Sequence, residues 1–237
     1  MIRPAMGSAL FVTGTDTGVG KTVVTAALAL ATGAGVMKPI GCGVAQGEEE
    51  HADTRFLREA SGSGDRPEEV TPLCFRAFRA PLVAARLEGR VVDLAPVWTV
   101  LERMRARHTL LLVEGVGGVR VPIAPGYEVL DFLRDAKMPA LIVARSGLGT
   151  MNHTALTAEA LSRRGIPVIG FVLNDGAAPC EDSLAQENAA VASAMTGLSC
   201  LGRLRPDPLV QAGRRALSPA TVGAVSAAAM AWARRAA

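Results

Sequence analysis

The sequence predicts an α/β fold in which helices flank a doubly wound, mostly parallel sheet. Short apolar runs alternate along the chain with segments of helical character, a pattern typical of strands joined by right-handed crossovers. Only 4% of the residues are aromatic, whereas alanine, valine, leucine and glycine abound, which favours helices packed closely on a parallel sheet. A glycine-rich turn follows the first apolar run directly, and in such sheets ligands gather at the carboxyl ends of the strands.

The elements can be placed in order along the chain. Five short apolar runs are expected to be buried strands, at residues 9–13, 109–113, 140–144, 167–173 and 198–202. Three segments are expected to be helices, at residues 21–32, 93–107 and 151–164. The most polar stretches, 43–51 and 61–69, are expected to be loops, and residues 224–237 a closing helix.

The helix predicted at 93–107 shows the clearest periodicity. Asp93 is expected to be its N-cap. Its apolar residues recur at three- and four-residue spacing and would share one buried face: Leu94, Val97, Trp98, Leu101 and Met104.

Residues 10–22, LFVTGTDTGVGKT, have the sequence form of a phosphate-binding loop, or P-loop. Gly18 and Gly20 let the backbone turn so that successive N–H groups face phosphate oxygens, and the following helix adds its positive N-terminal end. Lys21 supplies a charge for the outer phosphates, and the Thr22 hydroxyl is placed to hold Mg²⁺. The segment therefore predicts a nucleotide-binding fold of the P-loop NTPase type.

This loop departs from the usual pattern at two positions. Thr15 stands where a glycine is usual, five residues before the final glycine, because Gly14 lies one residue too early. Asp16 occupies the position where ATPases of the ParA and MinD type carry a signature lysine that reaches the partner's nucleotide across a dimer. A carboxylate at this position argues against a partitioning or positioning ATPase.

Composition and charge exclude several classes of function. With 237 residues, 49% of them hydrophobic, the chain can bury a sizeable core, and we expect one domain over residues 1–237. The net charge of +3 is small and the arginines are scattered, so no nucleic-acid partner is indicated. Neither a signal peptide nor a membrane span is expected. The four cysteines have no disulfide or zinc spacing, which favours the reducing cytoplasm.

Charged residues follow two apolar runs and recur in the loop between them. Glu114 ends a buried strand, where it would either ligate Mg²⁺ or cap a backbone N–H. Lys38 follows the short apolar segment 35–37, so it would either neutralise charge in phosphoryl transfer or lie on the surface at a turn. Asp53 would either ligate the metal or cap a helix that starts at Thr54, and capping is the commoner use.

Two more segments at strand ends are candidates for ligand contacts. In GLGTMNH a glycine-rich turn leads into a helix, whose first N–H groups could bind an anion such as a substrate carboxylate. His153 in this segment is expected to be a packed or capping residue. Asn174 could read the edge of a base through its amide, although Asn-Asp-Gly is also a common turn.

Six motifs occur in the order and at the spacings of the dethiobiotin synthetase family: VTGTDTGVGKT, KPIGCG, the Asp53 segment, LVEGVGG, GLGTMNH and LND. They span roughly residues 8 to 205, so the chain resembles these ATP-dependent ligases of biotin biosynthesis over most of its length. The resemblance implies a homodimer in which CO₂ adds to an amine of 7,8-diaminononanoate. The resulting carbamate would attack the γ-phosphate of ATP, and the neighbouring amine would close the cyclic urea with loss of phosphate.

The resemblance also implies roles for individual residues. The nucleotide would contact Thr15, Asp16, Thr17, Gly18, Val19, Gly20, Lys21, Thr22 and Asn174. Mg²⁺ would be held by Thr22, Asp53 and Glu114. The substrate would contact Lys38, Cys42, Gly118 and Val119, and, from the partner subunit, the segment with Gly149, Thr150 and Asn152. Catalysis would depend on Thr17, Lys21 and Lys38.

The chain departs from the family pattern at three places. Cys42 stands where the KPxxSG motif has a serine or threonine, and Gly18 stands where some members have a glutamate. Residues 181–190 contain no tyrosine, which some members place against the substrate carboxylate. These departures concern substrate contacts more than the reaction.

Two other functions remain as alternatives. An amidoligase of the cobyrinic acid synthase type shares this nucleotide domain, but such proteins usually add a glutamine amidotransferase domain, for which 237 residues have no room. An ATPase switch of the ParA or MinD type would need the signature lysine, and usually a basic surface or a membrane-seeking tail.

Overall fold

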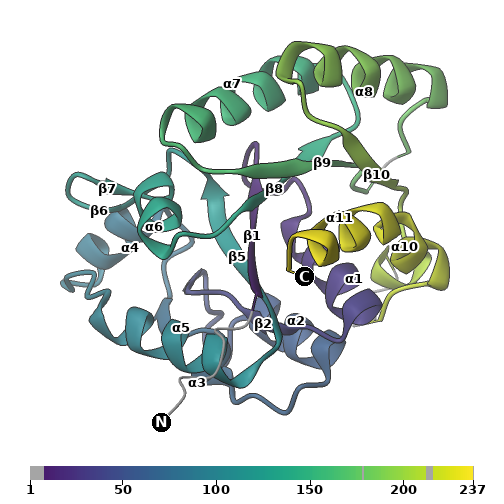
Figure 1. Cartoon of the computed structure of the whole chain (residues 1–237). Helices are drawn as coiled ribbons and strands as arrows, with labels where there is room; N and C mark the ends of the chain where they lie inside the picture. Colours follow the sequence, from purple (N-terminus) through teal and green to yellow (C-terminus); the bar gives the residue numbers. More distant parts are fainter. Residues whose placement is uncertain (1–7, 178, 212–215, 237) are drawn as a thin grey trace, which may run out of the picture.

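A six-stranded sheet forms the centre of the protein in the computed structural model, which describes residues 8–177, 179–211 and 216–236 (Figure 1). Its strands lie in the order β10 (Cys200–Leu204), β9 (Val168–Asn174), β8 (Ala140–Arg145), β1 (Ser8–Gly14), β5 (Leu110–Gly118) and β2 (Gly35–Met37). All neighbouring strands pair in parallel, which confirms the predicted fold class. The carboxyl ends of all six strands therefore lie at one edge of the sheet.

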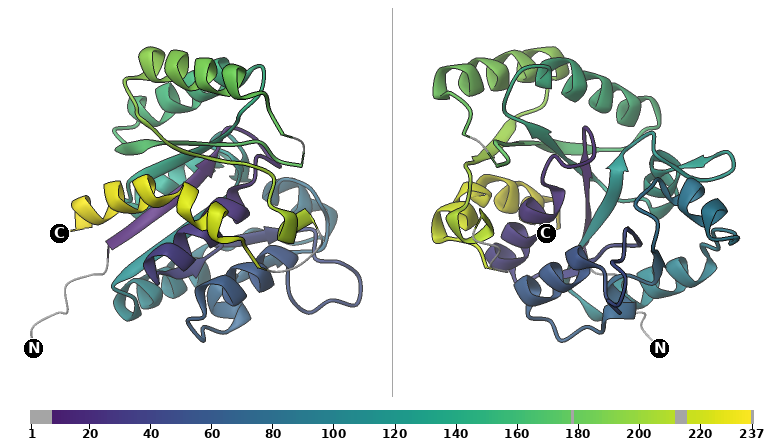
Figure 2. Two further views of the ribbon diagram at one scale, coloured as in Figure 1. Left: turned by 90° about the vertical axis from the view of Figure 1, so that its right-hand side faces the viewer. Right: turned by 180° about the vertical axis from the view of Figure 1, so that it is seen from behind.

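Helices cover both faces of this sheet (Figure 2). One face packs against α1 (Lys21–Thr32), α2 (Ala52–Ser61), α10 (Pro219–Ala224) and α11 (Ser226–Ala236). The other packs against α5 (Ala95–Arg107), α6 (Val129–Ala136), α7 (Thr150–Arg163) and α8 (Asp182–Thr196). Three shorter helices lie in the connections: α3 (Pro67–Val70), α4 (Pro81–Leu87) and α9 (Pro208–Gln211).

The central strand β1 divides the core into two halves because successive side chains of a strand point to opposite faces. Phe11 packs in the core on the α5 to α8 side, whereas Leu10 and Val12 pack in the core on the α1 side. All three side chains are at most 1% exposed. Near the beginning of the same strand, Trp232 of α11 donates its indole N–H to the Ser8 hydroxyl over 3.2 Å.

The predicted strands and long helices are present, with small shifts of their bounds. The strand expected at 198–202 runs from Cys200 to Leu204, and the helix expected at 151–164 begins at Thr150. The predicted buried face of α5 is confirmed, since Val97, Leu101 and Met104 are fully buried. None of the four cysteines, all of which lie in the described residues, forms a disulfide.

Three of the expected boundaries were wrong. Residues 61–69 are not a single loop: α2 ends at Ser61, and α3 begins at Pro67, where the Glu69 carboxylate accepts the Arg66 N–H over 3.1 Å. Asp93 lies two residues before α5, and its carboxylate accepts the Ala95 N–H over 2.9 Å. The closing helix is divided at Val225 into α10 and α11, and the last predicted residue lies outside the described residues.

Four short strands were not predicted. β3 (Ile40–Cys42) pairs with β4 (Leu73–Phe75), and β6 (Pro122–Ala124) pairs with β7 (Tyr127–Glu128). Strands of two or three residues are too short to show a hydrophobic period. Over the described residues, no helix is both long enough and apolar enough to cross a membrane.

Candidate active site

The P-loop connects β1 to α1 at the carboxyl edge of the sheet, and its conformation depends on glycine. Gly18 and Gly20 have φ angles of 73° and 89°, in the left-handed region that side chains rarely adopt. A Cβ atom on Gly20 would also lie 1.9 Å from Nδ2 of Asn174, the last residue of β9. Asn174 approaches the loop this closely because its amide donates to the Val19 carbonyl over 2.9 Å.

Lys21, the first residue of α1, is folded back over the loop. Its Nζ donates to the Asp16 carbonyl over 3.0 Å, and the side chain is almost fully buried. Burial is the main cause that lowers the pKa of Lys21 from 10.5 to about 8, although the Glu114 carboxylate partly opposes it. The ammonium therefore lies in a site that holds too little negative charge to stabilise it. A bound phosphate group would supply that charge.

Beside the P-loop, four residues from four segments form a polar cluster, here called the carboxylate–lysine cluster: Thr22, Lys38, Asp53 and Glu114. Lys38 Nζ donates to Glu114 Oε1 over 2.8 Å and also contacts Asp53 Oδ2. The Thr22 hydroxyl donates to the same Glu114 Oε1 over 3.0 Å. The Lys38 and Glu114 side chains are 7% and 0% exposed, whereas that of Asp53 is 37% exposed.

The charges in this cluster determine its ionisation. Burial alone lowers the pKa of Lys38, but the carboxylates of Glu114 and Asp53 outweigh it and raise this pKa above its ordinary value. Burial alone raises the pKa of Asp53, but the Lys38 ammonium outweighs it and lowers that pKa. Lys38 is therefore a permanent cation held between its two carboxylate contacts.

The cluster also fits a divalent cation. Glu114 Oε2 is buried and has no hydrogen-bond partner among the described residues, so it is an acceptor that still lacks a ligand. In the described part of the chain, no three His, Cys, Asp or Glu side chains converge as they would in a protein-only metal cage. Two carboxylates and one hydroxyl beside a phosphate site match Mg²⁺, which completes its shell with phosphate oxygens and water.

Asp53 does not cap α2, although capping is the commoner role of an aspartate near the start of a helix. The helix begins at Ala52, and its N-cap is His51, whose Nδ1 accepts the Asp53 N–H over 3.2 Å. The His51 ring is fixed from the other side, because its Nε2 lies 3.0 Å from the Cys42 carbonyl. Since His51 makes the cap, the Asp53 side chain is available to reach Lys38.

Cys42 ends β3 close to this cluster, and its side chain is buried. Burial raises the pKa of its thiol to about 12, with the charge of Lys38 only partly opposing the shift. The thiol is therefore neutral at physiological pH and is not an activated nucleophile. It can act only as a small, weakly polar contact for a ligand.

The glycine-rich end of β5 faces the P-loop. A Cβ atom on Gly117, whose φ is 61°, would lie 3.2 Å from the Thr17 hydroxyl, so the P-loop and the end of β5 approach closely there. Gly118 is half-buried, and Val119 is buried and accepts the Leu130 N–H over 2.9 Å. Of the predicted substrate contacts, Lys38, Cys42, Gly118 and Val119 thus lie on segments around one end of the sheet.

The remaining predicted substrate contacts lie elsewhere along the same edge. Gly149 is the N-cap of α7, Thr150 is buried, and Asn152 is exposed. This helix follows β8, which is separated from β2 by β1 and β5. At about 4.8 Å between neighbouring strands, the separation across the sheet is about 14 Å. Among the described residues, the hydrogen bonds and ion pairs of the Lys38 side chain go to Asp53 and Glu114, and none of them reaches the α7 N-terminus.

Arg145 at the end of β8 was not among the predicted site residues. Its guanidinium lies 2.6 Å from Oδ2 of Asp16 in the P-loop. Glu114 and Asn174 were predicted as site residues because each has a charged or amide side chain at the end of a strand. Arg145 meets the same criterion, since it follows the apolar run at 140–144.

Comparisons with known proteins give the family of this chain. A family model described as an AAA domain matches residues 8–214. The chain is 44% identical over 211 residues to the ATP-dependent dethiobiotin synthetase BioD of Anaeromyxobacter dehalogenans (strain 2CP-C), over 88% of this chain and 94% of that protein. It is 43% identical over 169 residues to the BioD of Bacillus velezensis, over 69% of this chain and 72% of that protein.

A solved structure with the same fold is the cell division ATPase MinD of Pyrococcus furiosus. It superimposes with a TM-score of 0.58 over 97% of this chain and 100% of that chain, at 17% sequence identity. At this identity the match shows the P-loop NTPase fold alone, whereas the BioD relatives share both length and sequence with this protein. The chain belongs to the family of ATP-dependent dethiobiotin synthetases and is an enzyme of the ligase class.

Proposed function

We propose that this enzyme converts 7,8-diaminononanoate, CO₂ and ATP to dethiobiotin, ADP and phosphate, with Mg²⁺, in a single domain. CO₂ adds to one amine to form a carbamate, and a carbamate oxygen attacks the γ-phosphorus as ADP leaves. The second amine then attacks the carbonyl carbon of the carbamic–phosphoric anhydride, phosphate leaves, and the cyclic urea is formed. The observation that carries this proposal is the carboxylate–lysine cluster beside the P-loop in a chain of this family.

The residues of the P-loop would bind and orient ATP. The N–H groups between Thr15 and Thr22 would surround the phosphates, and the buried Lys21 ammonium would pair with the outer ones. Thr17 faces Gly117 at the end of β5, so its hydroxyl would lie where the transferred group meets the substrate. Asn174 would contact adenine with the amide hydrogen that it does not donate to Val19.

Lys38 would stabilise the negative charge that builds up when the carbamate attacks the γ-phosphate. Its carboxylate contacts and low exposure keep it charged and in a fixed position, as electrostatic catalysis requires. Thr22, Asp53 and Glu114 would hold Mg²⁺, which supplies charge neutralisation and a template for the phosphates when bound. Cys42, Gly118 and Val119 would line the diamine.

We further propose that the enzyme is a homodimer with each substrate site near the interface. The α7 N-terminus follows β8, three strands from the strand β2 that precedes Lys38, and we infer that its N–H groups reach the substrate carboxylate from the partner subunit. Exposed apolar side chains lie just before this helix and midway along it, with Leu148 85% and Leu156 56% exposed. Four free cysteines fit an enzyme of the cytoplasm.

The reaction is tested by incorporation of labelled bicarbonate into acid-stable product, with Mg²⁺ and ATP, in the presence and absence of 7,8-diaminononanoate. We expect label that depends on the diamine and is matched by phosphate release. Lys21→Ala is the control, since it should abolish turnover while the protein stays folded. Phosphate release without label would contradict the proposal and would favour an ATPase of another function.

The shared site is tested by mixing two inactive variants. Lys38→Met removes the catalytic lysine, whereas Asn152→Ala removes a side chain that would contact the partner's substrate. If the dimer exchanges subunits, a mixed dimer regains one intact site, so activity should return on mixing. A chain that stays monomeric in light scattering at working concentrations would contradict the dimer without contradicting the reaction.

The site offers no support for an ATPase switch. Asp16, at the position of the signature lysine in that class, is paired with Arg145 of its own chain.

A further inference from the structure

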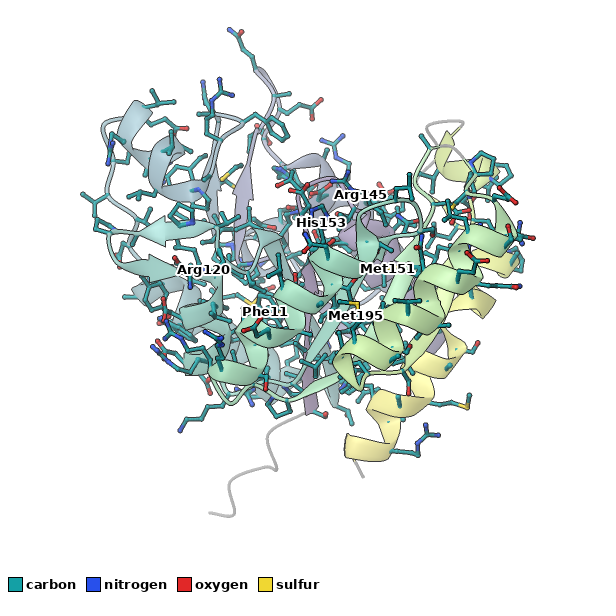
Figure 3. All side chains as sticks on the ribbon, turned by 90° about the horizontal axis from the view of Figure 1, so that it is seen from above. Phe11, Arg120, Arg145, Met151, His153 and Met195 are labelled. Atoms are coloured by element: carbon teal, nitrogen blue, oxygen red, sulfur yellow. The ribbon has the colours of Figure 1, made fainter. Side chains whose placement is uncertain are left out.

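Two side chains from neighbouring strands hold the P-loop at two points. Arg145 and Asn174 are register partners at the carboxyl ends of β8 and β9. Arg145 contacts the Asp16 carboxylate near the beginning of the loop, and Asn174 contacts the Val19 carbonyl near its end. Figure 3 labels Arg145 among the side chains, together with Met151 and His153 of α7, the helix that follows β8. The sheet edge thus braces both ends of the loop.

The Asp16 carboxylate uses both of its oxygens within this brace. Oδ1 accepts the backbone N–H of Thr17 over 2.7 Å, while Oδ2 accepts from the Arg145 guanidinium over 2.6 Å. The Asp16 carbonyl is also the acceptor for Lys21 Nζ. Asp16 therefore links a strand-end arginine to the backbone and the lysine that would bind phosphate.

A carboxylate in a phosphate-binding loop is electrostatically unfavourable for binding. A nucleotide brings several negative charges to the loop, and an unpaired Asp16 would repel them at short range. The Arg145 guanidinium cancels this charge with a hydrogen-bonded contact and fixes the carboxylate in the orientation that caps Thr17. Both side chains are about half exposed, so the effect is expected to be moderate.

We propose that Arg145 is a positioning residue for the nucleotide, acting through Asp16: it holds the P-loop and cancels the charge of a carboxylate that would otherwise repel phosphate. This inference rests on the proposed function only in that the P-loop binds ATP. It assigns Arg145 no contact with the reacting atoms.

The test is a double-mutant cycle measured as nucleotide binding. The Kd of ADP and of ATP is determined by calorimetry at constant Mg²⁺, without the diamine, for the wild type, Arg145→Met, Asp16→Asn and the double variant. Arg145→Met should weaken binding about twofold to fivefold, because Asp16 is left uncompensated. Asp16→Asn should bind as tightly as the wild type or tighter, and in the double variant it should restore most of the lost affinity.

Matched controls separate this role from general damage. Arg163→Met removes an exposed arginine that pairs with Glu159 at the far end of α7, and it should leave nucleotide affinity unchanged. At saturating ATP, kcat of Arg145→Met should stay within about twofold of the wild type, so the effect appears in KM for ATP. Arg145→Lys, which keeps the charge, should recover part of the affinity.

Three results would overturn the proposal. Unchanged affinity in Arg145→Met would show that the contact is irrelevant, and a loss that persists in the double variant would mean that Arg145 binds phosphate directly. Weaker binding in Asp16→Asn alone would mean that the carboxylate assists the nucleotide. Because this last result needs only the Asp16→Asn variant, it can still overturn the proposal if Arg145→Met fails to fold. If the wild type binds ATP but makes no diamine-dependent product, the proposed reaction fails and this inference stands.

Discussion

Lys38 donates to Glu114 over 2.8 Å at a position where the glutamate side chain has no exposed surface. Asp53 contacts the same ammonium, while the second Glu114 oxygen has no partner among the described residues. Without a metal ion, the lysine is thus the cation that neutralises both carboxylates of the candidate metal site. In the proposed function the same carboxylates would be shared with Mg²⁺, so Lys38 and the metal would be coupled.

Lys38→Met should therefore destabilise the enzyme in a way that Mg²⁺ reverses. Removing the ammonium leaves Glu114 buried without a counter-charge, which costs about 3 kcal/mol of the free energy of unfolding. Urea unfolding with and without Mg²⁺ measures this cost, and the stabilisation by Mg²⁺ should be larger in the variant than in the wild type. Turnover should be lost in both conditions.

The control for that experiment is Lys137→Met, which removes an exposed lysine far along the chain from the cluster. It should change neither stability nor the effect of Mg²⁺. An equal loss of stability in Lys38→Met with and without Mg²⁺ would mean that the metal does not use these carboxylates.

Gly20→Ala should damage the P-loop more than Gly18→Ala does. Both glycines have positive φ, so each substitution costs about 1 kcal/mol in backbone strain. At Gly18 no described atom lies within 4 Å of the added Cβ, but at Gly20 the Cβ would displace the Asn174 amide and break its bond to Val19. Urea unfolding and ADP binding should both show the difference. If stability recovers partly in Gly20→Ala with Asn174→Ala, the clash is the cause; equal effects at the two glycines would exclude it.

Cys42→Ser should be tolerated. The thiol is buried and neutral, with its pKa raised to about 12, so no step depends on its ionisation. A hydroxyl is a better hydrogen-bond partner, and KM for the diamine should stay equal or fall a few-fold while kcat is retained. Cys42→Ala serves as the comparison, since it offers neither group. Complete inactivation by serine would show that the sulfur itself is needed.

Lys21 should take up a proton when nucleotide binds near pH 8. Its pKa is lowered to about 8 in the free enzyme, mainly by burial, and phosphate would raise it again by favouring the charged ammonium. Affinity should be highest below pH 8 and should fall, by at most about tenfold per unit, as the pH rises through 8.

Calorimetry in buffers of different ionisation enthalpy measures this proton uptake directly. Lys21→Arg is the control, because a guanidinium stays charged throughout the range and its binding should release or take up no proton at this site. The same proton uptake in Lys21→Arg as in the wild type would assign the effect to another group.

The elements that were predicted correctly are those whose signal is local. A buried strand such as 109–113 is apolar over its whole length, and a P-loop combines its glycines, lysine and threonine within a few residues. Because parallel strands end at one edge, Glu114 and Lys38 could be expected near the loop. The direct contact between them could not, since they lie 76 residues apart and meet only through sheet pairing.

The role of Asp53 shows where local rules fail. Aspartate is a better helix cap than histidine by propensity, but His51 is held in place by the Cys42 carbonyl, a tertiary contact that no capping rule contains. Arg145 was missed for a different reason. Arg145 matters through its contact with Asp16 in the P-loop. That contact arises because β8 lies beside β1 in the sheet.

The contact between Trp232 and Ser8 joins the last helix to the first strand, at the opposite end of β1 from the P-loop. The half of the core beside α1 includes Ala228 and Trp232 of α11. Trp232 and Ser8 are 224 residues apart in the sequence. Contacts between such distant segments are slow to form because the entropy of closing the long loop between them must first be lost, so this half of the core is expected to be completed late in folding.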